Sequence, residues 1–264
     1  MSEYLDISQP YIDYGDEATF KVYFGFDPDT TKKVWDAIPE SKKTKEIHLL
    51  WALFYLKRYP VLLIAATIFK VDVKTYKKYV VKTITELNQC LPGFPTDFNQ
   101  INPDKTFIGS VDVTRCKIQK PTLECWQYWS GKDKFYALKY EIVVSYCKPK
   151  RIILVNGPYK GAYSDISVFR HRLTFMVPST KLLIGDKGYV GESSRILAPT
   201  KGLNITPDQR RMNYKLSKKR QDIERVNKRM KDWRFMALEF RSHDYTFHVI
   251  CVNVISWSQR NLAH

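Results

Sequence analysis

The chain has 264 residues, 44% of them apolar, so it can bury one large core or two modest ones. Its 43 Lys and Arg against 27 Asp and Glu give a net charge of +16. This charge indicates a polyanionic partner, with nucleic acid favoured over an anionic membrane surface. The alternative is that the lysines only solvate the surface. Five cysteines without a CxxC pair or a histidine at zinc-ligand spacing argue against a disulfide or zinc scaffold, and the most apolar run, 61–69, is too short to span a membrane.

Residues 1–40 are acidic, with nine Asp or Glu against three Lys. Their turn-rich stretches, "PYIDYGDE" and "FDPDTT", predict an irregular N-terminal arm. The start of the chain is polar, so we expect no signal peptide and a soluble protein in a reducing compartment.

Residues 41–92 have a helical period. The segment "KEIHLLWALFYLKRYP" predicts a helix that ends at Pro60, and a short helix, the turn "KVD" and a longer helix capped by Asp72 follow it. This order predicts a helix-turn-helix whose last helix faces DNA with Lys74, Thr75, Lys77 and Lys78. An ordinary helical bundle with a solvated lysine face explains the same pattern, and this segment alone leaves both interpretations open.

Pro92, Pro95 and Pro103 indicate a linker, and a strand-rich region, assigned to 100–264, follows. Strands are expected at 106–114, 134–147 and 151–159, the last two as a hairpin around "KPK", then a helix at 164–173 capped by Ser164 or Asp165, and a strand within "KLLIGD". A basic amphipathic helix at 217–236 and a weaker helical pattern near the C-terminus complete the region. This order predicts an α/β fold with a ribonuclease-H-like mixed sheet.

Such a sheet would bring three acids together: Asp112 on its first strand, Asp186 after its fourth, and Glu224 on the helix at that edge. Oxygen ligands of this kind hold Mg²⁺ or Mn²⁺, and two such ions can support in-line phosphoryl transfer. Gly185 and Gly188 are expected to leave room for a phosphate backbone. Basic residues near these acids are expected to contact DNA phosphates, namely Lys187, Arg225, Lys228, Arg229 and Lys231.

Five motifs occur in an order and spacing that resemble the PIF/Harbinger group of DDE-type transposases, over about residues 100–260: "GSVDVT", "SGKDKFYALKYEIVV", "GPYKGAYSDISVFR", "LLIGDKGYVG" and "RQDIERVNKRMKDWR". The resemblance implies a metal-binding triad of Asp112, Asp186 and Glu224, with Asp165 as a further acid at the metal site. It also implies action on double-stranded DNA at transposon ends and targets, a nuclear location and a Myb-like accessory DNA-binding protein. A homo-oligomer is left open.

Simpler roles exist for each acid: an ion pair for Asp112, a helix cap for Asp165, a turn for Asp186 and a solvated pair with Lys228 for Glu224. The run "WQYW" at 126–129 suits either base stacking or hairpin packing. Three functions therefore compete: an active nuclease and strand transferase, a domesticated derivative that binds DNA or protein without cutting, and an unrelated nucleic-acid-binding module.

Overall fold

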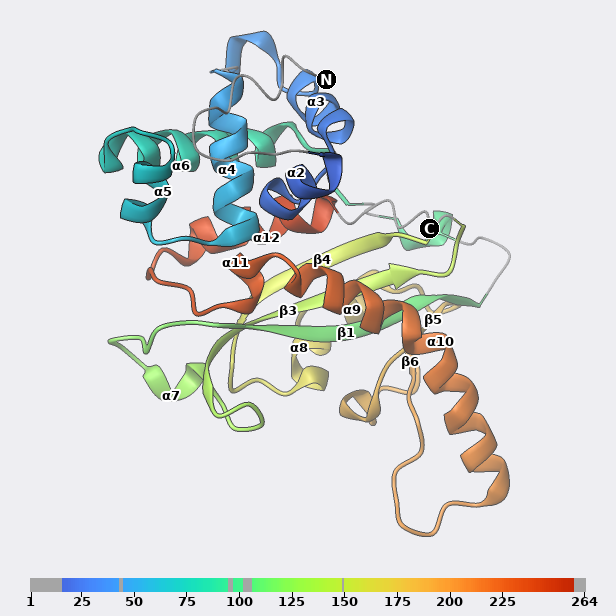
Figure 1. The fold of residues 1–264 in the computed structure, drawn as a ribbon. Coiled ribbons are helices and arrows are strands. Elements are labelled where there is room, and N and C mark those ends of the chain that lie inside the picture. The colour runs from blue at the N-terminus through green and yellow to red at the C-terminus, as the bar shows by residue number, and fades with distance from the viewer. Residues whose placement is uncertain (1–15, 43–44, 95–96, 102–105, 149, 259–264) are drawn as a thin grey trace. The chain divides into compact units, whose positions relative to one another are not determined.

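The computed structural model of the chain describes residues 16–42, 45–94, 97–101, 106–148 and 150–258 (Figure 1). Residues 1–15 of the predicted arm, linker residues 95–96 and 102–105, and residues 259–264 lie outside this description. The chain packs as two compact units. The helical unit comprises the residues up to Pro92 together with 231–240 and 244–255, and the sheet unit comprises chiefly 93–230.

The expectation of an irregular acidic arm is wrong for its described part. Residues 16–36 form two helices, α2 (Glu17–Phe24) and α3 (Pro28–Asp36). The acids that suggested turns are helix caps: Asp16 accepts a hydrogen bond from the Thr19 N–H, and Asp27 accepts one from the Thr30 N–H, both at 2.7 Å. Pro28 then occupies the first turn, where a missing N–H costs nothing.

Three further helices follow the predicted pattern, and they are α4 (Glu46–Arg58), α5 (Leu62–Ile68) and α6 (Val73–Cys90). Helix α4 ends at Arg58, and the next residue, Tyr59, takes a left-handed conformation before Pro60. Asp72 caps α6 by accepting from the Lys74 and Thr75 N–H groups, as predicted. Tyr76, Val80 and Ile84 are buried along one side of α6, while the helix-turn-helix function of this arrangement stays a prediction.

The sequence predicts a catalytic region that extends to residue 264. In the structure, however, residues 231–240 and 244–255 pack with the N-terminal helices in one unit. This part holds α11 (Arg234–Ala237) and most of α12 (Tyr245–Ser258). Aromatic contacts explain the grouping: a side chain on Gly25 would collide with the Trp233 ring, and the Phe235 ring centroid lies 5.1 Å from that of Tyr59. No helix in the described ranges is long and apolar enough to cross a membrane.

A mixed sheet forms the centre of the other unit (Figure 1). Its strands are β1 (Phe107–Lys117), β2 (Trp129–Ser130), β3 (Phe135–Ser145), β4 (Ile152–Lys160), β5 (Leu182–Ile184) and β6 (Ile196–Leu197). Strands β1, β3 and β4 form an antiparallel meander, which includes the predicted hairpin, and β5 and β6 extend the sheet in parallel from β1. This mixed topology is consistent with a ribonuclease-H-like domain.

The core of the sheet unit consists of apolar side chains from β1, β3, β4 and β5 packed with those of α8 (Asp165–His171) and α9 (Leu173–Met176). Val111 and Val113 lie in this core, so side-chain alternation turns Asp112 to the other face of β1. Short elements that the sequence did not predict are α7 (Cys125–Tyr128), β2, α9 and β6.

The basic helix α10 (Pro207–Lys231) begins ten residues earlier than predicted and ends five residues sooner. Its start has a reciprocal cap: Thr206 Oγ1 accepts from the Gln209 N–H, and Gln209 Oε1 accepts from the Thr206 N–H. The first turns of α10 are largely exposed, and its first buried residue is Leu216. The sequence pattern therefore revealed the packed part of α10 alone.

Candidate active site

Asp112 and Asp186 follow paired positions on two adjacent parallel strands. Ser110 on β1 pairs with Ile184 on β5. Asp112 lies two residues after Ser110, and Asp186 lies two residues after Ile184. Because the two strands are parallel and pair in this register, Asp112 within β1 lies at the same level as Asp186 just after the end of β5. The electrostatic influence of Asp186 on Asp112 agrees with this proximity.

Asp186 begins the short 3-10 helix η3 (Lys187–Tyr189), and its Oδ1 accepts a hydrogen bond from the Gly188 N–H at 2.7 Å. A methyl group placed on Gly188 would lie 2.8 Å from Asp186 Oδ1 and 3.0 Å from Asp165 Oδ2. The carboxylates of Asp165 and Asp186 therefore both lie against Gly188. Asp186 therefore stabilises the turn through the Gly188 N–H and also lies near another acid, Asp165.

The glycines do not leave the open space that the sequence suggested. A side chain on Gly185 would collide with the Tyr189 ring at 2.8 Å, and one on Gly188 with the two carboxylates. Gly185 is needed because Tyr189 folds back beside it, and Gly188 because the acids close around it. The expectation of free room for a phosphate backbone at these two positions is wrong.

Asp165 is held by two cations at the start of α8. Its Oδ1 lies 3.2 Å from Arg115 Nη2 and 3.7 Å from Lys139 Nζ. Arg115 also pairs with Asp133 at 3.1 Å, and Lys139 donates to the Tyr163 carbonyl. The helix cap is Ser164, whose hydroxyl accepts from the Ser167 N–H, so the capping alternative applies to Ser164.

Helix α10 contacts Asp112 through a residue that the sequence did not single out. Asn227 Nδ2 donates to Asp112 Oδ2 at 2.9 Å, while Asp112 Oδ1 accepts from the Val113 N–H at 2.9 Å. Glu224, one turn earlier on the helix, is exposed and forms no ion pair with Lys228 in the described structure. Since residues three apart on a helix share a side, Glu224 lies on the same side of α10 as the Asn227 contact.

Burial raises the pKa of Asp112 to about 6. Arg220 and the Val113 N–H oppose the shift, while the negative charges of Asp186 and Asp165 add to it.

A second acid, Glu141 on β3, is fully buried, and burial raises its pKa to about 8. It accepts hydrogen bonds from Tyr189 Oη and Asn156 Nδ2, both at 3.4 Å, so the sheet holds an acid that the sequence did not flag.

The carboxylate oxygens of Asp112 and Asp186 are the kind of ligand that hard divalent cations prefer. In the described residues, no group of three or more His, Cys, Asp or Glu side chains is arranged to hold a metal ion on its own. Mg²⁺, however, is commonly held by one or two carboxylates together with waters and substrate phosphates. Asp112 and Asp186 supply two carboxylates, whereas the charge of Asp165 is already balanced by Arg115 and Lys139.

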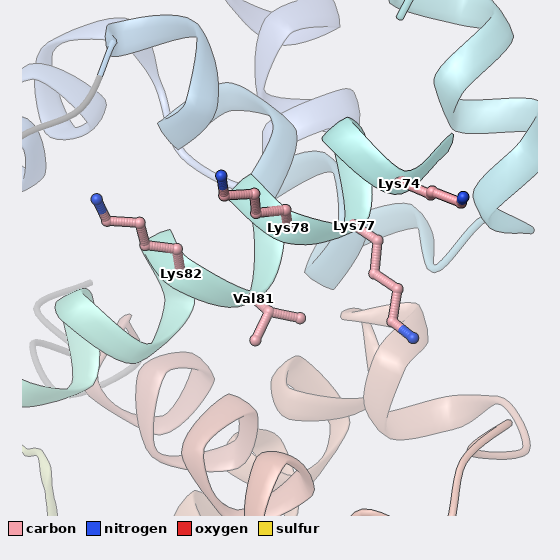
Figure 2. Close-up of a pocket in the computed structure, with 5 residues that line it drawn as sticks. All are labelled: Lys74, Lys77, Lys78, Val81 and Lys82. Carbon is pink, nitrogen blue, oxygen red and sulfur yellow. The ribbon is translucent and has the colours of Figure 1, made fainter. Parts of the chain in front are cut away.

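The predicted DNA-facing residues of α6, Lys74, Thr75, Lys77 and Lys78, are all exposed. Together with Lys82 and Val81, the three lysines line a hollow of about 480 Å³. Figure 2 shows the ammonium groups of Lys78 and Lys82 on one side of Val81 and those of Lys74 and Lys77 on the other. We call this surface the α6 lysine face.

The other predicted phosphate contacts differ in availability. Lys187, Arg225 and Lys228 are exposed, although Arg225 lies 3.8 Å from Asp222, and Arg229 is partly buried. Lys231 donates to the Met236 carbonyl at 3.2 Å, so its ammonium group already has a partner.

The tryptophans of "WQYW" are only partly packed. Trp129 contacts the Tyr136 ring edge-on at 5.1 Å, which agrees with the hairpin-packing alternative. Trp126 on α7 is 68% exposed, and nearby residues of the same hairpin, Lys132 and Lys134, are exposed as well. Trp126 therefore remains available for stacking.

The mixed sheet defines an α/β domain consistent with a ribonuclease-H-like fold, and comparison with known proteins specifies its family. Residues 111–256 match the DDE superfamily endonuclease family, and the chain belongs to that family. A relative described as "Probable transposase for insertion sequence element IS702", from Microchaete diplosiphon, is 28% identical over 153 residues, which is 55% of this chain and 54% of the relative. The chain thus spans about half the length of the curated relative it matches, and no solved structure matches it. The family match confirms the DDE part of the predicted resemblance.

Proposed function

We propose that this protein is a metal-dependent DNA endonuclease and strand transferase that cuts transposon ends and joins them to target DNA. The observation that carries the proposal is that Asp112, within β1, and Asp186, just after β5, follow paired positions of two parallel strands at the same spacing. The DDE endonuclease match over residues 111–256 supports it, as does the similarity to a probable transposase.

Asp112, Asp186 and Glu224 are the proposed catalytic carboxylates and, with Asp165, the proposed metal-site acids. When bound, Mg²⁺ or Mn²⁺, as one ion or a pair, would supply Lewis acidity for phosphoryl transfer. Arg115 and Lys139 balance the charge of Asp165, which limits repulsion of an incoming phosphate backbone. The exposed position of Glu224 leaves its carboxylate accessible to the same site from α10.

DNA is the proposed macromolecular partner, and two basic surfaces would divide its binding. The α6 lysine face, with Thr75, would select the duplex as part of a helix-turn-helix within residues 41–92. The basic side chains near the acids would hold the DNA backbone, namely Lys187, Arg225, Lys228, Arg229 and Lys231. The acidic segment 1–40 would precede both, and the catalytic region would begin near residue 100.

The finer identity rests on the motif resemblance alone. It comprises membership of the PIF/Harbinger group, a nuclear location and a Myb-like accessory protein. The five free cysteines among the described residues accord with the reducing compartment that such a location provides.

The test is conversion of supercoiled plasmid to nicked and linear forms by the purified chain. We expect cleavage with Mg²⁺ or Mn²⁺ and none with EDTA. DNA binding without cleavage at any divalent-ion concentration would instead support a domesticated derivative, while metal-independent binding of all polyanions alike would indicate a general nucleic-acid-binding module.

A further inference from the structure

The amide of Asn227 is the group of α10 that touches an acid of the candidate site. Its Nδ2 donates to Asp112 Oδ2 at 2.9 Å, and the Val113 N–H donates to the other oxygen of the same carboxylate. Each oxygen of Asp112 thus has a fixed donor. This pair of contacts holds the carboxylate in one orientation.

The same contact fixes which way the Asn227 amide faces. An ionised carboxylate only accepts hydrogen bonds, so the NH₂ group must face Asp112 and the amide oxygen must face elsewhere. That oxygen, Asn227 Oδ1, is buried and has no hydrogen-bond partner in the described structure. Buried acceptors without a partner are uncommon in native proteins, so each one calls for an explanation such as an ion.

Another asparagine of the same helix shows that this is not a general property of α10. Asn213 Oδ1 accepts from the Thr200 N–H at 2.9 Å, and its Nδ2 donates to the Thr200 carbonyl at 3.1 Å. Both ends of the Asn213 amide are therefore satisfied. Asn227 differs because one end is committed to Asp112 and the other is left unfilled.

We propose that Asn227 is a positioning residue for Asp112 and that its amide oxygen is a ligand of a divalent cation at this site, directly or through a bound water. The inference rests on the proposed function and adds a residue to its metal site. A neutral amide suits the position, because it contributes an oxygen without adding negative charge beside Asp112, Asp186 and Asp165. Amide oxygens are established ligands of hard divalent cations.

The experiment measures Mn²⁺ affinity of the full chain by electron paramagnetic resonance, without DNA. The variants are Asn227→Ala, Asn227→Asp and the matched control Asn213→Ala. We expect Asn227→Ala to weaken Mn²⁺ binding by about 10-fold or more, the usual effect of removing a residue that supports a metal ligand. Asn213→Ala should change affinity by less than about twofold, since Asn213 touches only the Thr200 backbone.

Asn227→Asp retains the side-chain shape and an oxygen ligand but loses the N–H donor to Asp112. It therefore separates the ligand role from the positioning role: if the oxygen is a ligand, it should bind Mn²⁺ more tightly than Asn227→Ala, and it serves the test if the alanine variant folds poorly. Unchanged Mn²⁺ affinity in Asn227→Ala would overturn the inference and leave the proposed function standing. An Asn227→Asp variant that binds no better than Asn227→Ala would overturn the ligand role of the oxygen. A wild-type chain that binds no Mn²⁺ would overturn the proposed metal site and this inference together.

Discussion

Asn227 and Asp112 are 115 positions apart in the sequence, and a hydrogen bond of 2.9 Å joins their side chains. The contact attaches the basic helix α10 to the central strand of the sheet at the level of the candidate active site. Any change that shifts α10 will therefore move a donor away from Asp112.

Gly188 is the first place where the geometry can be tested. Gly188→Ala places a methyl group 2.8 Å from Asp186 Oδ1 and 3.0 Å from Asp165 Oδ2, so these carboxylates must shift. We expect metal-dependent cleavage to fall by at least about 10-fold, because small misplacements of catalytic groups are costly. The matched control is Gly131→Ala, since nothing lies within 4 Å of a methyl group there. Equal activity of both variants would show that the carboxylate positions are not critical.

The α6 lysine face should bind duplex DNA. Changing Lys74, Lys77 and Lys78 together to Gln should weaken binding and lower the slope of log affinity against log salt by about 0.9 per lost phosphate contact. If α6 also reads bases, preference among duplex sequences should change. The control is Lys32→Gln with Lys33→Gln, two exposed lysines on α3. Affinity, salt slope and preference that all match the wild type would identify the segment as a plain helical bundle.

Trp126 should stack on unpaired bases. Trp126→Ala is expected to weaken binding of an oligothymidine by about 1–3 kcal/mol, and Trp126→Phe by less, because a ring remains. Tryptophan fluorescence or anisotropy of a labelled oligonucleotide, measured without metal, reports the affinity. Phe175→Ala, which removes an 83% exposed ring on α9, is the control. A loss as large in the control as in Trp126→Ala would indicate a non-specific effect.

Glu141 should make stability depend on pH. Burial raises its pKa from the ordinary 4.5 to about 8, so the folded chain keeps a proton that the unfolded chain loses. Its contribution to the free energy of unfolding is therefore full below pH 4.5 and is lost as pH rises toward about 8. Glu141→Gln, which is neutral throughout, should remove this decline.

Thermal unfolding in EDTA at pH 6 and pH 9 provides the measurement for Glu141. The wild type should lose more stability between the two values than Glu141→Gln does. Glu124→Gln, at an exposed position, should follow the wild type. Parallel melting curves for wild type and Glu141→Gln would mean that Glu141 is ionised in the folded chain at both pH values.

Much of the fold could be predicted because its signals are local. The apolar stripe of α6 and its cap at Asp72 are legible within a few residues, as are the long strands β3 and β4. Helices α2 and α3 were missed because Asp16 and Asp27 suit a turn as well as a cap. The start of α10 carried a local signal, the Thr206 to Gln209 cap, in a segment that lacks an apolar stripe.

The candidate site was predictable only in part, because its contacts join distant segments. Motif order pointed to Asp112 and Asp186, and strand pairing sets them at the same level on β1 and just after β5. Nothing local distinguishes Asn227 from other polar residues of a basic helix, and its role emerges only from the contact with β1. The cations that balance Asp165 likewise lie on β1 and β3, far from α8 in sequence.

The most direct test of the proposed nuclease is Asp186→Asn, assayed for divalent-ion-dependent cleavage of supercoiled DNA and, in parallel, for DNA binding. The amide retains the shape of the side chain and can still accept from the Gly188 N–H, but it lacks the negative charge that attracts a cation. We expect cleavage to be abolished while DNA affinity stays within about twofold of wild type. Cleavage by Asp186→Asn at the wild-type rate would contradict a catalytic role of Asp186.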